Sequence, residues 1–221
     1  MGQIEKNAQV EDILTGVART LHHWRRLERS LLDVLSRCMD ARDPGAADIV
    51  WENITPFPQK LRAMSDMLKL RIHDDMARDL WTQLSRMVCE HSRLRLQLSQ
   101  YQIQRVDNAP RLVLKTGDES VIQLPSARTA QLEEWDPILS SALEAAHAAS
   151  LPSGYTAVEI DDIAQVISDL ADNISWYSDW VIEYGHIPSD YAPPPPPLIN
   201  AMLGELQSQA VSGNSQPAYL T

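Results

Sequence analysis

DMARDLWTQLSRMVCEHSRLRLQLSQY, residues 75–101, is the longest segment of the chain with the pattern of one helix. Its apolar residues recur at steps of three and four, which places them along one face of a helix. That face comprises Leu80, Leu84, Met87, His91, Leu94 and Leu98. Such a face is buried against other elements, so the segment predicts a helical core. A histidine on an apolar face is usually satisfied by a hydrogen bond, and we favour that interpretation of His91 over a functional one.

Three further helices are predicted before this segment. Residues 10–40 keep helical spacing of apolar residues over about four heptads. A turn at residues 43–45 precedes a short helix at 46–53, which two prolines then end. The next helix is expected at 58–72, with Pro58 at its first position. Asp74 or Asp75 is placed to cap the segment quoted above. The apolar face of the first helix is predicted to comprise Val10, Leu14, Val17, Leu21, Trp24, Leu31, Leu35 and Cys38.

The pattern changes after residue 101. Residues 101–106, 111–115 and 120–124 are short, rich in β-branched side chains and separated by turn residues, which predicts a small β-hairpin or three-stranded meander. A helix is expected at 137–150 and another at 159–184. The second has a packing seam of period 3.5 that faces a helix of the same or of a second subunit. We favour a core position for Trp176 and Trp180, which flank that seam, over a ligand platform. The seam comprises Ile160, Ile163, Ile167, Leu170, Ile174, Tyr177, Val181 and Tyr184.

These elements predict a mainly α protein, a helical bundle with a small β-hairpin or meander inserted around residues 101–124. We expect one domain at residues 1–190, with a helical core at 10–101 and acidic helices at 129–184. The proline run at 193–197 predicts an extended spacer, so residues 191–221 form a linker and tail. Within the tail, residues 198–209 are amphipathic and residues 212–221 are expected to be disordered.

Charge is distributed unevenly along the 221 residues, whose formal net charge is -11. Residues 1–115 contain 18 basic and 15 acidic side chains, whereas residues 116–221 contain 15 acidic side chains and one basic, Arg128. The net charge argues against tight, non-specific binding to nucleic acid or to an acidic membrane. The asymmetry suits internal charge complementarity or a self-complementary dimer, but a solvated acidic surface is the favoured interpretation.

The sequence contains none of the common motifs for metals, cofactors or nucleophiles. Cys38 and Cys89 lie within helical apolar patterns, so no disulfide framework is implied and neither is expected to be nucleophilic. The chain has no paired-cysteine motif, no His-Glu-x-x-His, no glycine-rich phosphate loop and no Gly-x-Ser-x-Gly. We therefore expect no metal and no cofactor. Neither a signal peptide nor a run of 18 apolar residues occurs, so the expected location is cytoplasmic, with no membrane contact.

One face of the first predicted helix is basic, with Arg19, Arg25, Arg26 and Arg29. It is either an anion-binding strip or an ordinary solvated face paired with Glu28 and Asp33 on neighbouring turns. We favour the solvated face, because charge runs on helices are usually of that kind.

The segment from Trp24 to residue 101 resembles the helical HEPN-like domains, across about residues 10–101. The matching residues are Trp24, Leu27, Glu28 and Leu31, then Ala46, Ala47 and Ile49, then Phe57, Lys60 and Leu61, then Trp81 and Leu84, and finally Arg93. In that family the last helix has an arginine, often followed by asparagine, and a histidine five residues after the arginine. The resemblance implies that this pair cleaves RNA without a metal, at a dimer interface.

This chain departs from the family pattern at the decisive positions. Arg93 matches the arginine, but Leu94 stands at the asparagine position and Leu98 at the histidine position. A leucine cannot take or give a proton, so the agent of general acid–base catalysis is missing. His91 is not a substitute, because its spacing directs it to another face of the helix. Arg93 retains the ability to hold a phosphate or carboxylate in a bidentate contact, or pairs with an acid such as Glu90.

Three hypotheses follow. The first is a non-catalytic helical interaction protein that forms a homodimer and binds a protein partner. The second is a metal-independent ribonuclease that uses Arg93 with Glu28 or a recruited histidine, His91 among the candidates. The third is nucleic-acid binding without cleavage through Arg25, Arg26, Arg29 and Arg19, or through Arg93, although the net charge disfavours RNA.

Overall fold

The computed structural model describes residues 2–40, 43–98, 101–106, 109–114, 154–187 and 194–213. The predicted strand at 120–124, the predicted helix at 137–150 and residues 214–221 of the predicted disordered tail lie outside these ranges. Contacts divide the chain into two compact units. Unit 1 comprises Met1–Arg26 and Arg86–Ser168, and unit 2 comprises Leu27–Ser85 and Asp169–Thr221. The predicted single domain stays a prediction, since the unit boundaries fall inside three continuous helices.

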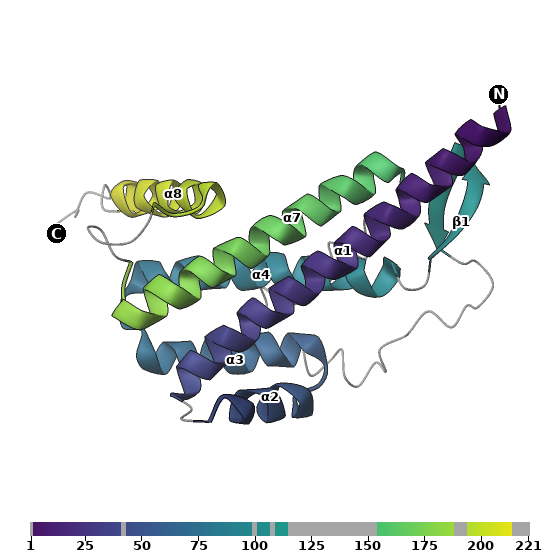
Figure 1. The fold of residues 1–221 in the computed structure, drawn as a ribbon. Coiled ribbons are helices and arrows are strands. Elements are labelled where there is room, and N and C mark those ends of the chain that lie inside the picture. The colour runs from purple at the N-terminus through teal and green to yellow at the C-terminus, as the bar shows by residue number, and fades with distance from the viewer. Residues whose placement is uncertain are drawn as a thin grey trace, which may run out of the picture. The chain divides into compact units, whose positions relative to one another are not determined.

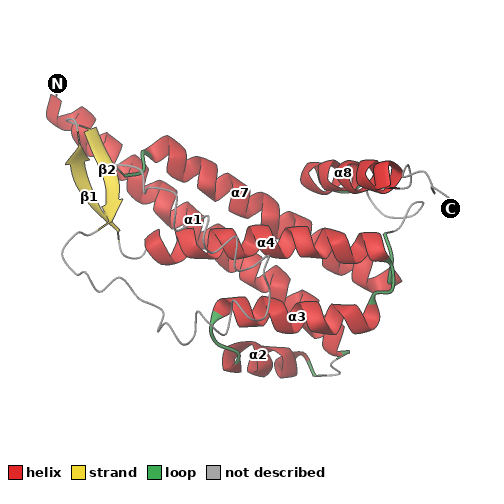
Figure 2. Cartoon of the chain, turned by 180° about the vertical axis from the view of Figure 1, so that it is seen from behind, coloured by secondary structure: helices red, strands yellow, loops and turns green. Residues whose placement is uncertain are grey.

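The described chain is mainly helical, as predicted, and Figures 1 and 2 show the helices with one small hairpin. Four helices come first: α1 (Gly2–Met39), α2 (Pro44–Asn53), α3 (Phe57–Arg71) and α4 (Asp75–Leu98). Strands β1 (Tyr101–Val106) and β2 (Ala109–Leu114) follow and pair antiparallel. After them come α7 (Ala157–Trp176), the π-helical turn η1 (Tyr177–Ile182) and α8 (Pro197–Gly213).

The starts of the helices follow from local chemistry. Asp43 caps α2 by accepting a hydrogen bond from the Gly45 N–H at 2.9 Å, and Asp74 caps α4 by accepting one from the Ala77 N–H at 2.7 Å. Helix α7 begins with a reciprocal capping box. Its Glu159 carboxylate accepts the Thr156 N–H at 2.7 Å, while the Thr156 hydroxyl faces the Glu159 N–H at 3.3 Å. Each cap satisfies backbone donors that have no partner within the helix.

Unit 1 has its core where α1, the end of α4, the hairpin and the start of α7 meet. Ile13, Leu98, Leu112 and Ile160 are buried together there. Leu112 of β2 also exchanges two backbone hydrogen bonds of 2.9 Å with Tyr155, just before α7. The hairpin therefore has both an apolar contact and a backbone contact with the helices. Such support is needed, because an isolated two-stranded hairpin is marginally stable in water.

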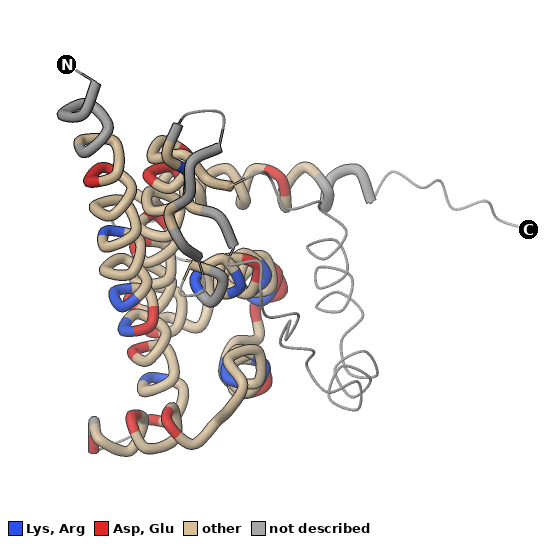
Figure 3. Tube along the Cα trace, turned by 90° about the vertical axis from the view of Figure 1, so that its right-hand side faces the viewer, with Lys and Arg blue, Asp and Glu red and all other residues tan. Residues whose placement is uncertain are grey.

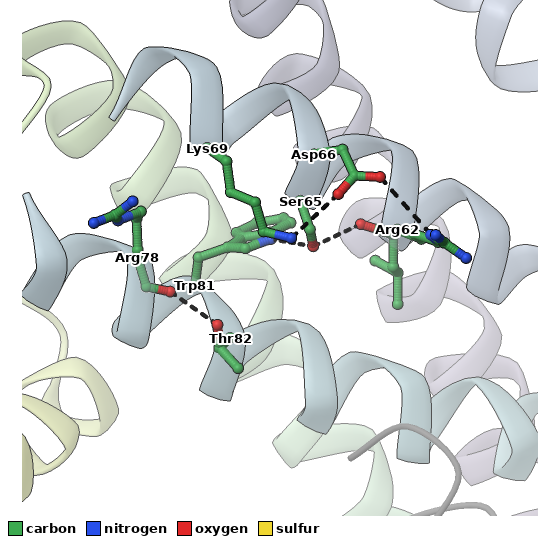
Figure 4. Close-up of polar contacts among 8 residues, drawn as sticks. Arg62, Ser65, Asp66, Lys69, Arg78, Trp81 and Thr82 are labelled. Carbon is green, nitrogen blue, oxygen red and sulfur yellow. Dashed lines mark hydrogen bonds and ion pairs between the residues drawn. The ribbon is translucent and has the colours of Figure 1, made fainter. Parts of the chain in front are cut away.

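Unit 2 is built around the second halves of α1 and α7 with α2, α3 and the first half of α4. Trp81 of α4 donates its indole N–H to the Ser65 hydroxyl of α3 at 2.8 Å, as Figure 4 shows. Tyr177 of η1 donates its hydroxyl to the Ala77 carbonyl of α4 at 3.0 Å, and its ring lies 5.5 Å from that of Trp81. The buried core of this unit includes Leu27, Leu31, Leu35, Leu61, Met64, Leu68, Leu80, Leu84, Ile174 and Val181.

Helices α1 and α7 run parallel to each other in each unit. In unit 1, Arg19 pairs with Asp161 at 2.8 Å and Arg26 donates to the Ser168 hydroxyl at 3.2 Å, both at a separation of 142 residues. In unit 2, Arg37 pairs with Asp179 at 2.6 Å, again 142 residues apart. A constant separation means that both helices advance in the same direction, which Figure 1 also shows. The basic half of the sequence thus pairs with the acidic half inside one chain.

Most of the predicted seam of α7 is used within the chain, although Ile163 is only half-buried. Ile160, Ile167, Leu170, Ile174, Tyr177 and Val181 are each 0% exposed, so they are not available to a second subunit. Trp176 is a core residue, as predicted, at 7% exposed, whereas Trp180 is only half-buried. The prediction for Tyr184 was wrong, because this residue is 49% exposed. The π-helical turn before it explains the difference: its i→i+5 bonding rotates later residues away from the face that a 3.5-residue period would give.

The prediction for the first half of α1 was also partly wrong. Leu14 and Leu21 are 56% and 40% exposed, whereas Ile13 and Thr20 are buried. The buried face includes Gly16, where an added Cβ would meet Ile160 Cγ2 at 2.9 Å. Because a glycine permits α7 to approach this closely, the first half of α1 buries Gly16 and Thr20 and leaves Leu14 and Leu21 exposed.

Candidate functional site

Arg93 lies half-buried on the second half of α4, in unit 1. Burial lowers the pKa of its guanidinium, while the thiol of Cys89 and the carboxylate of Glu90 act in the opposite direction. An arginine stays protonated under all ordinary conditions, so this group is a fixed positive charge. It is suited to binding an anion rather than to moving a proton.

Leu98 stands at the family's histidine position and His91 is a further catalytic candidate on α4, and both make contacts inside the fold. Leu98, at the histidine position, is 6% exposed and belongs to the core cluster of unit 1. His91 is half-buried, and its Nδ1 lies 2.8 Å from the Met87 carbonyl of its own helix. A carbonyl only accepts, so Nδ1 holds the proton and donates it. The predicted structural interpretation of His91 agrees with this hydrogen bond.

Glu28, the third catalytic candidate, lies in unit 2 and faces a different set of groups. Its carboxylate and that of Glu52 raise the pKa of Lys60, although burial, the larger cause, lowers it. The Lys60 ammonium lies 4.3 Å from the ring centroid of Trp51. The charge of Glu28 thus acts on Lys60, which makes a cation–π contact with Trp51.

The basic face of α1 is largely engaged inside the chain. Arg19 and Arg26 contact Asp161 and Ser168 of α7, as described above. Arg29 pairs with Asp33 one turn later at 3.6 Å, which is the pairing expected for a solvated face. Arg25 is exposed and has no ion pair within the ranges that the structure describes. An anion-binding strip would have to displace most of these contacts.

A polar hollow of about 280 Å³ occurs in unit 2, lined by Ser36, Arg37, Asp40, Arg71, Ile182 and Glu183. Both guanidinium groups at its rim are paired. Arg37 lies between Asp179 at 2.6 Å and Glu183 at 3.5 Å, and Arg71 lies 3.7 Å from Asp40. Exposed ion pairs of this kind stabilise a fold by about 0–1 kcal/mol each. The hollow is therefore a set of satisfied charges, not a cluster of groups aimed at a ligand.

The first half of α1 presents a face of a different kind. Glu11, Leu14, Ala18, Leu21 and Arg25 are all exposed and are spaced by three, four, three and four residues, so they form one line along the helix. We call these five residues the α1 stripe. Its centre is apolar and its two ends have opposite charge. The sequence pattern could have shown it, but the same leucines also extend the stripe that was assigned to the core.

Among the described residues, no group of three or more His, Cys, Asp or Glu side chains is arranged to hold a metal ion. None of the described helices is both long and apolar enough to cross a membrane. No family model, no curated protein and no solved structure matches the chain. The HEPN-like resemblance accordingly stays a prediction.

Proposed function

We propose that this chain is a non-catalytic helical interaction protein, and that the α1 stripe is the surface with which it binds another protein chain. The observation that supports this most strongly is the exposure of Leu14 and Leu21, at 56% and 40%, on a helix whose core-facing side is complete without them. Fully burying an exposed leucine yields about 1.5–3 kcal/mol, and covering the exposed part of each of these two side chains yields a fraction of that. Two leucines one heptad apart on a straight helix are typical anchors for a partner helix.

The positions of Leu98 and His91 on α4 support the proposal that the chain is not catalytic. A general acid or base must reach the substrate, and its pKa must allow proton transfer near the working pH. Leu98 has no titratable group and fills the core of unit 1. His91 uses Nδ1 to bind its own helix. Arg93 alone keeps the chemistry that the family motif requires.

Site-specific photo-cross-linking tests the interaction surface. A benzophenone amino acid is placed at Leu14 in the full chain, and the same group is placed at Thr15 as the matched control. Thr15 is exposed on the same helix, next in sequence but turned about 100° away from the stripe. We expect cross-linked products heavier than the 24.8 kDa chain from position 14 and few from position 15. Equal labelling at both positions, or no heavier product from position 14, would contradict the proposal.

A cleavage assay tests the ribonuclease alternative, which the fixed, half-buried charge of Arg93 favours. The purified chain is incubated with mixed cellular RNA and a metal chelator, alongside Arg93→Ala and the control Arg95→Ala, an exposed arginine on the same helix. We expect equal, background cleavage by all three proteins. Cleavage that disappears in Arg93→Ala but persists in Arg95→Ala would establish the enzyme and refute the non-catalytic proposal.

A further inference from the structure

The α1 stripe has one leucine on each side of its middle residue, Ala18, and opposite charges at its two ends. Ala18 lies seven residues after Glu11 and seven before Arg25, so the two charged ends stand about 10 Å on either side of it along the helix axis. Leu14 lies four residues before Ala18, and Leu21 lies three residues after it. Figure 3 shows the same order along α1, with acidic segments near its start and basic segments further along.

We infer that the partner of the α1 stripe is a second copy of this chain, bound antiparallel about a two-fold axis at Ala18. The inference rests on the proposed function, because it assigns the occupant of the same surface. A two-fold axis at Ala18 places Glu11 of each copy opposite Arg25 of the other. It also brings Leu14 of each copy next to Leu21 of the other, offset by one residue. Every group of the stripe then meets a complementary one, as an isologous interface requires.

Charge selects the antiparallel arrangement over the parallel one. In a parallel pair Glu11 would face its own copy and Arg25 would face its own copy, and both contacts would be repulsive. Ala18 at the crossing point has the smallest side chain of the stripe, so the two helix axes can approach to about 8 Å, the lower end of the usual range. The seam of α7 does not compete for this role, because it is buried inside the chain.

The size of the stripe sets the strength of the dimer. The five residues span about 21 Å of helix. One pair of helices of that length forms a contact below the roughly 1,200 Å² of buried surface that is usual for stable complexes. We therefore expect a dimer that dissociates reversibly.

A charge-exchange experiment tests the pairing with the full chain. Glu11→Arg gives a stripe that is basic at both ends, and Arg25→Glu gives one that is acidic at both ends. Each variant alone has two repulsive contacts per dimer, so we expect its dissociation constant in sedimentation equilibrium to rise about tenfold or more. A one-to-one mixture has two attractive contacts again and is expected to associate as tightly as the unmodified chain.

Salt dependence provides a second measurement on the same proteins. Adding salt screens exposed charges, so it should weaken the dimer of the unmodified chain and strengthen the dimers of the single variants. Circular dichroism of each variant checks that its helix content is unchanged. The pairing is overturned if the mixture associates no better than either variant alone. It is also overturned if both variants associate as tightly as the unmodified chain.

The cross-linking experiment separates failure of this inference from failure of the proposed function. A product from position 14 at twice 24.8 kDa supports the second copy. A product at another mass supports protein binding by the stripe but overturns the second copy as its occupant. A cross-link confined to a single chain means that the chain itself covers the stripe, and it overturns both.

Discussion

Replacement of Gly16 by alanine is expected to destabilise unit 1, although alanine is the better helix former. Gly16 lies inside α1, at its closest approach to α7. A Cβ atom there would stand 2.9 Å from Ile160 Cγ2 and 3.3 Å from Asp161 Oδ1. Ile160 is 0% exposed and belongs to the core cluster of the unit, so it cannot move without disturbing its neighbours.

The magnitude follows from two opposing effects. Alanine in place of glycine in an open helix stabilises by about 1 kcal/mol. Overpacking a filled core costs about 1–3 kcal/mol. Gly204 supplies the first effect without the second, because it is an exposed residue of α8 where an added Cβ would have no neighbouring atom within 4 Å. The free energies of unfolding of the two variants should therefore differ by about 1–3 kcal/mol, with Gly204→Ala the more stable.

Thermal and urea denaturation of the two variants and the unmodified chain provide the measurement. Each kcal/mol shifts the thermal midpoint of a chain of this size by about 2–4 °C. A double-mutant cycle with Ile160→Ala isolates the steric contact, since the penalty at position 16 should disappear once the facing methyl group is removed. If Gly16→Ala stabilised the chain as much as Gly204→Ala, the close contact between α1 and α7 would be refuted.

Four further outcomes are expected. Tyr177→Phe should lower the free energy of unfolding by about 1 kcal/mol, because its buried hydroxyl donates a hydrogen bond, whereas Tyr184→Phe, on a half-exposed ring, should be neutral in the same urea titration. Glu159→Gln should flatten the acid dependence of the thermal midpoint. The capping-box bonds lower the pKa of Glu159 in the folded chain, so its contribution is complete above the ordinary value of 4.5 and is lost as pH falls through the lowered one. Leu98→His should destabilise by about 2 kcal/mol or more, since it buries a polar ring in the core of unit 1, and RNA assays should show no gain of cleavage. Burial raises the pKa of the Cys38 thiol to about 11, so Ellman's reagent should label it only when urea unfolds the chain, and rapid labelling of the folded protein would contradict its placement.

Local chemistry made much of the fold predictable from the sequence. The predicted helix at 46–53 is α2 (Pro44–Asn53), and the predicted start of α4 is fixed by the Asp74 cap. These boundaries depend on residues within one turn of each other, which a sequence displays directly. The mainly helical class and the hairpin from residue 101 were confirmed for the same reason.

Features that depend on distant residues were not predictable in this way. The choice between the Leu14 and Ile13 faces of α1 depends on the approach of Ile160, which lies far away in the sequence. The π-helical turn at Tyr177 is accompanied by a hydrogen bond to the Ala77 carbonyl, again a contact between separate elements. Sequence periodicity indicates that a helix has an apolar face. When a helix has two apolar faces, periodicity does not indicate which one is buried.

The candidate site divides in a similar way. The loss of the acid–base group at Leu98 is evident from the sequence, because no arrangement gives leucine a proton to transfer. That Leu98 is part of the core, and that Arg19 and Arg26 are engaged by α7, required the structure. The exposure of the α1 stripe likewise depends on how α1 packs against its neighbours, which the sequence does not show.

The parallel pairing of α1 and α7 has a consequence for biosynthesis. Its contacts join residues 142 positions apart, so they form only after a long loop is closed. Closing a loop of that length costs an entropic term of about 4 kcal/mol before any contact forms. On the ribosome, α1 emerges long before α7 exists, so the side of α1 that faces α7 stays uncovered while the intervening chain is translated. The pairing of α1 with α7 is therefore completed only late in synthesis.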